Sequence, residues 1–105
     1  MYYRKILIAD DDTTILKLYT SVLTRKTSIL EEDFILETFE NGIALLEHFK
    51  SEWNSGNRIP LCILDMNMPG MDGLETAREI RNIDSNVIII IVTAYATTSL
   101  AILKE

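Results

Sequence analysis

The sequence predicts an α/β fold built on a parallel sheet, and three observations support this prediction. Short apolar runs alternate along the whole chain with segments of helical periodicity, every run is followed by a polar or acidic residue, and no internal repeat is present. Strands that alternate with helices form parallel sheets with right-handed crossovers, which places helices on both faces. We therefore expect one doubly wound sheet, with its elements in the order βαβαβαβα.

Four segments have the composition of strands buried on both faces. They are short and mostly apolar, as is typical of the strands of a covered parallel sheet. The predicted strands are residues 5–9, 34–39, 61–64 and 87–92.

The first predicted helix runs from Thr13 to about residue 26. Its apolar residues recur every three or four positions, which is the pattern of a helix with one buried face. The stripe consists of Ile15, Leu18, Tyr19, Val22 and Leu23.

Three further helices follow. Asn41 is the expected N-cap of the second, whose apolar positions are Leu45, Leu46, Phe49 and Trp53. Asp72 and Glu75 have the spacing of a capping box for a third helix that ends near residue 81. The fourth helix is expected to begin at Thr97 or Thr98 and to run into the chain end.

Composition excludes several functional classes. The chain has 105 residues, and 16 acidic against 10 basic residues give a formal net charge of −6. Such a chain repels phosphate groups and is a poor non-specific binder of nucleic acid or anionic membranes. Its longest apolar run is far shorter than the roughly 20 residues that span a bilayer. A single cysteine, Cys62, excludes an internal disulfide and a cysteine-based zinc site, and a cytoplasmic location is expected.

Aspartates follow two of the predicted strands. Asp10, Asp11 and Asp12 follow the first, Asp65 follows the third, and the hydroxyl residue Thr93 follows the fourth. The carboxyl ends of parallel strands meet at one edge of a sheet, where ligands bind in folds of this kind. Crowded carboxylates repel one another unless a cation offsets the charge, and hard oxygen ligands suit Mg²⁺ or Mn²⁺. Such an ion attracts phosphate oxygens, and a neighbouring carboxylate can accept a phosphoryl group.

These segments resemble the receiver domain of two-component response regulators. The resemblance rests on residues 6–12, 64–73 and 92–96 and covers essentially the whole chain. Its most specific part is the loop Asp-x-x-Met-Pro-Gly-Met-Asp-Gly, which starts at Asp65. The resemblance implies a flavodoxin-like receiver fold over residues 1–105, with its strands in the spatial order 2-1-3-4.

The resemblance also implies a role for each matched residue. Asp65 corresponds to the phosphoacceptor, Asp11 to a direct metal ligand and Asp10 to a ligand acting through water. The backbone carbonyl of Asn67 corresponds to a third protein ligand.

Three matched positions lie around the phosphoacceptor. Thr93 corresponds to the switch hydroxyl that contacts the phosphoryl group, and the small residue Ala94 follows it. Asn67 and Tyr95 lie at the two positions that tune hydrolysis of the aspartyl phosphate.

One part of the family pattern has no counterpart. The family has a fifth strand beginning with a Lys-Pro step and a fifth helix, and we expect this chain to be truncated after its fourth helix. Lys104 lies in that helix and is not the phosphate-binding lysine. Strand four would then be an open edge, through which the chain could dimerise or exchange elements.

The predicted function is a phosphorylation-dependent signalling switch. A sensor histidine kinase or phosphotransfer protein would phosphorylate Asp65 in a Mg²⁺-dependent reaction, and an output domain or partner would bind the face of strand four and helix four. The chain would not be an enzyme beyond its own phosphorylation and slow dephosphorylation. Two alternatives stay open: a pseudo-receiver that binds constitutively, and a Mg²⁺-dependent phosphatase with an aspartate nucleophile.

Simpler roles are expected for several polar residues. Asp12 and Asp72 are interpreted as helix caps and not as ligands. His48 lies on the polar side of the second helix and is expected to be exposed, and Cys62 is expected to be a small buried apolar residue.

Overall fold

The computed structural model describes residues 4–29, 34–93 and 100–102. Within these ranges the chain forms a five-stranded sheet in the order β2-β1-β3-β4-β5. The strands are β1 (Arg4–Ala9), β2 (Phe34–Phe39), β3 (Leu61–Asp65), β4 (Ile88–Val92) and β5 (Leu100–Ile102). The helices are α1 (Thr13–Ile29), α2 (Gly42–Asn54) and α3 (Gly73–Ile83).

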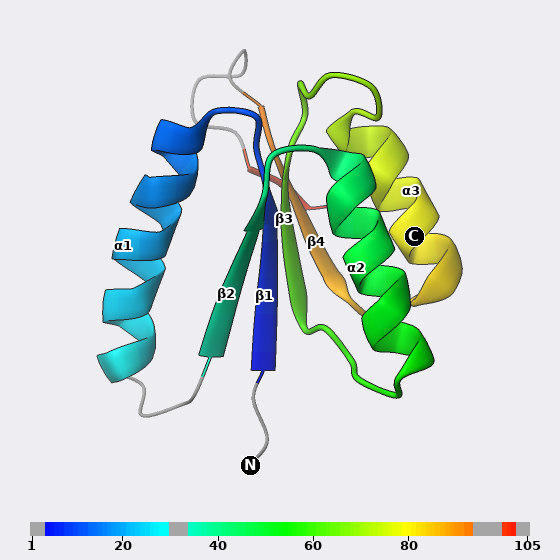
Figure 1. Cartoon of the computed structure of the whole chain (residues 1–105), viewed down its shortest axis with the longest axis horizontal. Helices are drawn as coiled ribbons and strands as arrows, with labels where there is room; N and C mark the ends of the chain where they lie inside the picture. The colour runs from blue at the N-terminus through cyan, green and yellow to red at the C-terminus, as the bar shows by residue number, and fades with distance from the viewer. Residues whose placement is uncertain (1–3, 30–33, 94–99, 103–105) are drawn as a thin grey trace.

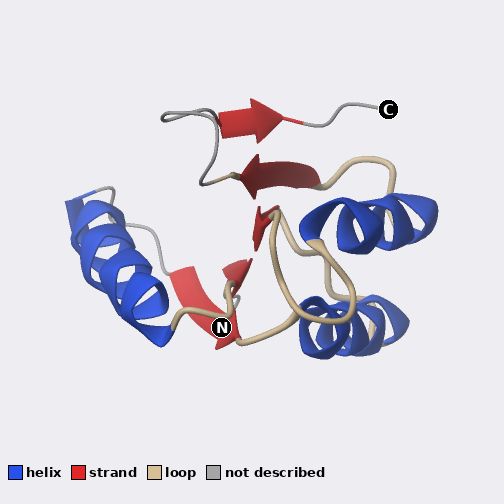
Figure 2. Ribbon diagram, turned by 90° about the horizontal axis from the view of Figure 1, so that it is seen from above, coloured by secondary structure: helices blue, strands red, loops and turns tan. Residues whose placement is uncertain are grey.

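The first four strands are parallel, and their order 2-1-3-4 confirms the predicted topology. Helices α2 and α3 cover one face of the sheet, and α1 lies on the other face (Figures 1 and 2). None of the helices that the structure describes is both long and apolar enough to cross a membrane.

The larger core lies between the sheet and the pair α2 and α3. Its fully buried side chains come from the strands and from the inner faces of both helices, and they include Leu7, Leu45, Phe49, Leu64 and Ile80. Burial of a side chain of this size contributes roughly 1.5–3 kcal/mol to stability. This core holds β1 and β3 side by side, and their carboxyl ends carry the acidic residues.

The end of the chain differs from the prediction. The prediction of a fourth helix is wrong for residues 100–102. These residues form β5, which pairs antiparallel with residues 90–92 of β4. The backbone groups on the outer edge of β4 need hydrogen-bond partners, and a short strand supplies them. The fold therefore has a fifth strand, and the open strand-four edge expected for dimerisation is occupied along residues 90–92. The remainder of the predicted helix, residues 97–99 and 103–105, lies outside the described residues.

The apolar residues that α1 buries also differ from those predicted. Among the side chains of α1 that the structure describes, Leu16 is the one that is buried, against Ile6, Ile8 and Ile63 of the sheet, and Tyr19 packs partly against the same cluster. Leu18 and Val22, which the periodicity placed in the buried stripe, are 56 % and 53 % exposed. The apolar surface of α1 is wider than the sheet beneath it can cover.

Candidate functional site

The carboxyl ends of β1, β3 and β4 bring the predicted site residues to one edge of the sheet. Ala9 is in register with Leu64, and Asp65 with Val92, so that Asp10 and Thr93 directly follow paired positions. Carboxylate oxygens of Asp10, Asp11 and Asp65 all lie within 4.8 Å of one another. The parallel register thus places three carboxylates around one small space.

Asp10 is the most buried of the three, with 8 % of its surface exposed. Its pKa is raised above the ordinary value chiefly because burial disfavours the charged form, and the charges of Asp11 and Asp12 raise it further. The backbone N–H of Asp12 donates to its Oδ1 at 2.9 Å, which opposes the rise. This hydrogen bond fixes the carboxylate at the edge of the site.

Asp65 ends β3 and is half-buried. Its pKa is also raised, first by burial and then by the charge of Asp10. Hydrogen bonds from the backbone of Asn67 and Met66 oppose the rise. The carboxylate is therefore held by its own loop, next to charges that favour its neutralisation by a proton or a cation.

The loop after β3 is fixed at both ends. The N–H of Met66 donates to the carbonyl of Val92 at 2.8 Å, and the N–H of Gly73 donates to the carbonyl of Met66 at 3.0 Å. A side chain at position 73 would collide with the backbone of Asp65, so only glycine allows α3 to start so close to the site. Gly70 has φ +81, a left-handed conformation that glycine adopts without strain.

The capping interpretations are confirmed. Asp72 accepts a hydrogen bond from the N–H of Glu75 at 2.8 Å, and the Glu75 carboxylate accepts one from the N–H of Asp72 at 3.1 Å. Asp12 accepts from the N–H of Thr14 at 2.9 Å and so caps α1. Neither Asp12 nor Asp72 belongs to the group of three carboxylates.

Of the four remaining predicted site residues, the structure describes two. Asn67 is exposed in the loop after β3, and Thr93 is half-buried directly after β4. Ala94 and Tyr95 lie outside the described residues, so their predicted roles stay predictions.

Tyr19 is a neighbour of the site that the sequence did not indicate. Its pKa is raised by burial and by the charges of Asp10 and Asp65, which places its phenol within the field of the carboxylates. The helical pattern of residues 13–26 marked it only as an apolar position, and no sequence signal pointed to the site.

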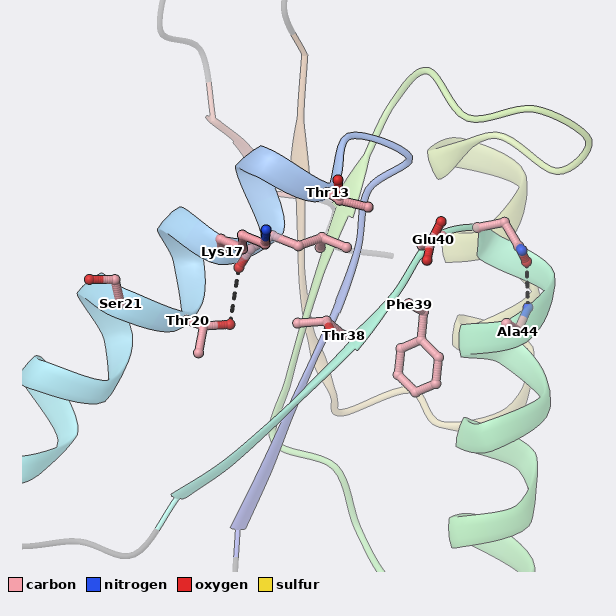
Figure 3. Close-up of a pocket in the computed structure, with 10 residues that line it drawn as sticks. Thr13, Lys17, Thr20, Ser21, Thr38, Phe39, Glu40 and Ala44 are labelled. Carbon is pink, nitrogen blue, oxygen red and sulfur yellow. Dashed lines mark hydrogen bonds between the residues drawn. The ribbon is translucent and has the colours of Figure 1, made fainter.

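A groove of about 800 Å³ lies between α1 and the end of β2 (Figure 3). Lys17 and Glu40 give it one charge of each sign, and the Thr20 hydroxyl within it already donates to the carbonyl of Leu16 at 3.0 Å. The groove is lined by none of Asp10, Asp11 and Asp65, so we place the candidate chemistry at the carboxylates.

The donor set fits a divalent cation. Carboxylates are hard oxygen ligands, and three of them around one space offer the charge that Mg²⁺ prefers. Burial and the charges of neighbouring aspartates raise the pKa of both Asp10 and Asp65, and a bound cation would offset that negative charge.

Comparisons with known proteins agree with this geometry. A model of the family "Response regulator receiver domain" matches residues 6–103. Sporulation initiation phosphotransferase F of Bacillus subtilis is 36 % identical over 97 residues, which cover 90 % of this chain and 68 % of that protein. The transcriptional regulatory protein CpxR homolog of Haemophilus influenzae is 33 % identical over 86 % of this chain, and the match covers only 34 % of its own length.

Solved structures share the fold. The response regulator protein TrrA of Thermotoga maritima in complex with Mg²⁺ and BeF is similar with a TM-score of 0.74 and 35 % identity, covering 89 % of this chain and 71 % of that one. TrrA in complex with the histidine kinase ThkA gives a TM-score of 0.73 at 35 % identity, covering 90 % and 72 %. With the family model, the parallel sheet and the three carboxylates at its edge, these likenesses show that the chain belongs to the receiver domain family of two-component response regulators.

Proposed function

We propose that this chain is a phosphorylation-dependent signalling switch with Asp65 as its phosphoacceptor. The observation that carries the proposal is the group of three carboxylates within 4.8 Å, with Asp65 at the end of the central strand β3. Asp65 is half-buried and held by backbone hydrogen bonds from its own loop. A fixed carboxylate next to a cation site is suited to attack a phosphoryl group.

Asp10, Asp11 and Asp65 would hold Mg²⁺, together with the backbone carbonyl of Asn67. When bound, the cation offsets the carboxylate charge and polarises a phosphoryl oxygen. The same oxygen ligands suit Mn²⁺ as a substitute. The similarity to TrrA, which was solved with Mg²⁺ and BeF, supports this assignment.

The transfer itself forms one bond and breaks one. A carboxylate oxygen of Asp65 attacks the phosphorus atom of a phosphohistidine on a sensor kinase or phosphotransfer protein. The new P–O bond forms as the P–N bond breaks, and the departing imidazole keeps the electron pair and takes up a proton. The similarity to a receiver solved in complex with a histidine kinase supports this class of donor.

The phosphorylated state would change the surface beside Thr93. Phosphorylation replaces the single negative charge of the Asp65 carboxylate with a phosphoryl group that carries roughly −1.5 to −2 charges. Asp65 is in register with Val92, so the Thr93 hydroxyl follows the neighbouring position on β4 and could donate to a phosphoryl oxygen. Reorientation of Thr93 would then alter the outer face of β4, which an output domain or partner protein could bind.

Intact mass spectrometry after incubation with acetyl phosphate tests this proposal. We expect the wild type to gain one phosphoryl group when Mg²⁺ is present and none when EDTA is present, and Asp65→Asn to gain none. Asp72→Asn is the matched control, because asparagine can still cap α3 and its carboxyl group lies outside the cluster.

Three outcomes contradict the proposal. Labelling of Asp65→Asn at the wild-type level would exclude Asp65 as the acceptor. Absence of labelling in the wild type, with partner binding unaffected by phosphodonor, would identify a pseudo-receiver. Many turnovers of a phosphate ester per chain, instead of stoichiometric labelling, would identify a phosphatase.

A further inference from the structure

The Asp65 side chain lies on the face of the sheet that α1 covers. Successive side chains of a strand point to opposite faces. On β3, Ile63 belongs to the apolar cluster beneath α1, whereas Leu64 belongs to the core beneath α2 and α3. Asp65 is the last residue of the same strand and follows Ile63 by two positions. Its carboxylate therefore points to the α1 face.

Asp10 lies on the same face. On β1, Ile8 belongs to the cluster beneath α1 and Ala9 to the opposite core. The N–H of Asp10 donates to the carbonyl of Phe39 at 3.0 Å, which continues the pairing of β1 with β2 by one residue. Asp10 thus extends the row of side chains that contains Ile8, and it points to the α1 face beside Asp65.

Tyr19 of α1 packs on this face of the sheet. It follows the buried Leu16 by three positions, and residues at that spacing share one side of a helix. The Tyr19 side chain is half-buried against the cluster that contains Ile8 and Ile63. The ring is therefore held on the rows of side chains that end in Asp10 and Asp65.

The geometry of α1 directs the Tyr19 hydroxyl towards the carboxylates. The helix begins at Thr13, just after the aspartates that follow β1. Tyr19 is six residues further on, which is about 9 Å along the helix axis. Long side chains on a helix lean back towards its N-terminus, so the phenol spans part of this distance.

Electrostatics agree with this placement. The pKa of Tyr19 is raised first by burial and then by the charges of Asp10 and Asp65. The phenol must lie close to both carboxylates to respond to them, because the interaction of charges weakens with distance. No hydrogen bond joins the Tyr19 hydroxyl to any residue that the structure describes, so this donor is available. A phosphoryl group on Asp65 would extend that side chain by two bonds and would present acceptor oxygens to it.

We propose that the Tyr19 hydroxyl donates a hydrogen bond to an oxygen of the phosphoryl group on Asp65, from the α1 face of the sheet. This inference rests on the proposed function, because Asp65 must carry the group. The bond forms only in the phosphorylated state, so it favours that state over the unphosphorylated one. It also gives α1 a direct contact with the phosphoryl group, separate from the contact at β4.

Binding of beryllofluoride, a stable mimic of a phosphoryl group, tests the proposal at equilibrium in the presence of Mg²⁺. Tyr19→Phe removes the hydroxyl and keeps the ring. We expect isothermal titration calorimetry to show a dissociation constant about tenfold higher than that of the wild type, as for loss of a hydrogen bond to a charged group. Thr20→Val is the matched control. It removes a hydroxyl from the next position of α1, which donates to the carbonyl of Leu16, and it should bind beryllofluoride like the wild type.

Fluorine NMR separates a direct contact from a structural role. The fluorine atoms of bound beryllofluoride stand in for the phosphoryl oxygens, and one of them would accept the hydrogen bond from Tyr19. We expect the resonance of one fluorine to shift in Tyr19→Phe, and the spectrum of Thr20→Val to match that of the wild type. The affinity for Mg²⁺ alone should be the same in all three proteins, because the hydroxyl contacts the phosphoryl group and not the metal ligands.

Two results would overturn the proposal and leave Asp65 as the phosphoacceptor. One is a Tyr19→Phe protein with the beryllofluoride affinity and fluorine spectrum of the wild type. The other is a loss of Mg²⁺ affinity in Tyr19→Phe by the same factor as the loss of beryllofluoride affinity, which would mean that the hydroxyl acts on the metal ligands. Failure of the proposed function is distinguishable, because the wild type itself would then bind no beryllofluoride and would gain no phosphoryl group from acetyl phosphate.

Discussion

Two clusters of charged side chains lie towards opposite ends of β1, and they differ in how their charges are balanced. At the carboxyl end, Asp10, Asp11 and Asp65 crowd within 4.8 Å, and the pKa values of Asp10 and Asp65 are raised by burial and like charge. Towards the amino end, Lys5 Nζ lies 2.7 Å from Glu52 Oε1 and 2.9 Å from Glu37 Oε1. This pairing raises the pKa of Lys5 and lowers that of Glu52.

Because its charges are paired, the amino-end cluster stabilises the fold, whereas the carboxyl-end cluster of like charges is available for chemistry. The amino-end cluster joins β1, β2 and α2 through opposite charges, and His48 extends it, with Nε2 3.1 Å from Glu37 Oε2. The carboxyl-end cluster places like charges together, and that arrangement costs stability until a cation binds. Groups whose pKa is strongly perturbed by burial and by like charges are candidates for function.

Removing the Lys5 ammonium group, which Glu37 and Glu52 share, should give the largest change in stability. Lys5→Met leaves Glu37 and Glu52 facing each other in a half-buried site, so we expect the free energy of unfolding to fall by about 2–3 kcal/mol, as for loss of one partner of a partly buried pair. Urea unfolding at pH 7 measures it. Arg4→Met is the control, because Arg4 is exposed on the same strand and should change stability little. Equal effects of the two variants would show that the amino-end cluster contributes no specific stabilisation.

Mg²⁺ should stabilise the protein only through the three carboxylates at the carboxyl end of the sheet. A ligand at ten times its dissociation constant stabilises the folded state by about 1.4 kcal/mol. We expect thermal unfolding to show this gain for the wild type and for Lys5→Met, and to show little of it for Asp11→Ala. Glu40→Gln, which removes an exposed carboxylate outside the cluster, should keep the full gain. An undiminished gain in Asp11→Ala would contradict its assignment as a ligand.

The two clusters also differ in how far the sequence indicated them. Asp10 and Asp65 end apolar runs, and a parallel sheet must bring such ends to one edge, so periodicity was sufficient to predict their meeting. The amino-end cluster was not predicted, because its members come from three elements and no local pattern records their contact. His48 was expected to be exposed, but it is partly buried, with its ring centroid 5.4 Å from that of Phe39.

The two errors in the fold have a related cause. The spacing of residues 100–103 suited a helix, but pairing with the edge of β4 is a long-range interaction that local spacing does not reveal. Leu18 and Val22 fit the helical stripe, yet burial depends on how much sheet lies under α1. Local periodicity predicted the kind of most elements, and tertiary context decided which apolar positions were covered.

Removing one of the three like charges should stabilise the metal-free protein. Asp65→Asn relieves the repulsion from Asp10 and Asp11, so we expect the free energy of unfolding to rise by about 1 kcal/mol at pH 7 in EDTA. When Mg²⁺ is added, the wild type should become the more stable of the two proteins, because it binds the cation and Asp65→Asn binds it poorly. Asp72→Asn should show neither effect. A loss of stability in Asp65→Asn without metal would mean that its backbone hydrogen bonds outweigh the repulsion.

The smallest effect is the dependence on pH, and it should have opposite signs at the two ends. The folded-state pKa of Asp10 is raised, so the metal-free wild type is less stable than Asp10→Asn at neutral pH, and this difference shrinks as pH falls towards the ordinary value of 3.8. The pKa of Glu52 is lowered, so the wild type is more stable than Glu52→Gln above the ordinary value of 4.5, and that advantage is lost as pH falls below it. Lower pH therefore reduces the repulsion in the carboxyl-end cluster and weakens the ion pairs of the amino-end cluster.

Urea unfolding of the wild type, Asp10→Asn and Glu52→Gln in EDTA between pH 3.5 and 7 measures both differences in stability, each expected to change by less than about 1 kcal/mol. If both differences changed in the same direction, the two clusters would not be balanced in opposite ways.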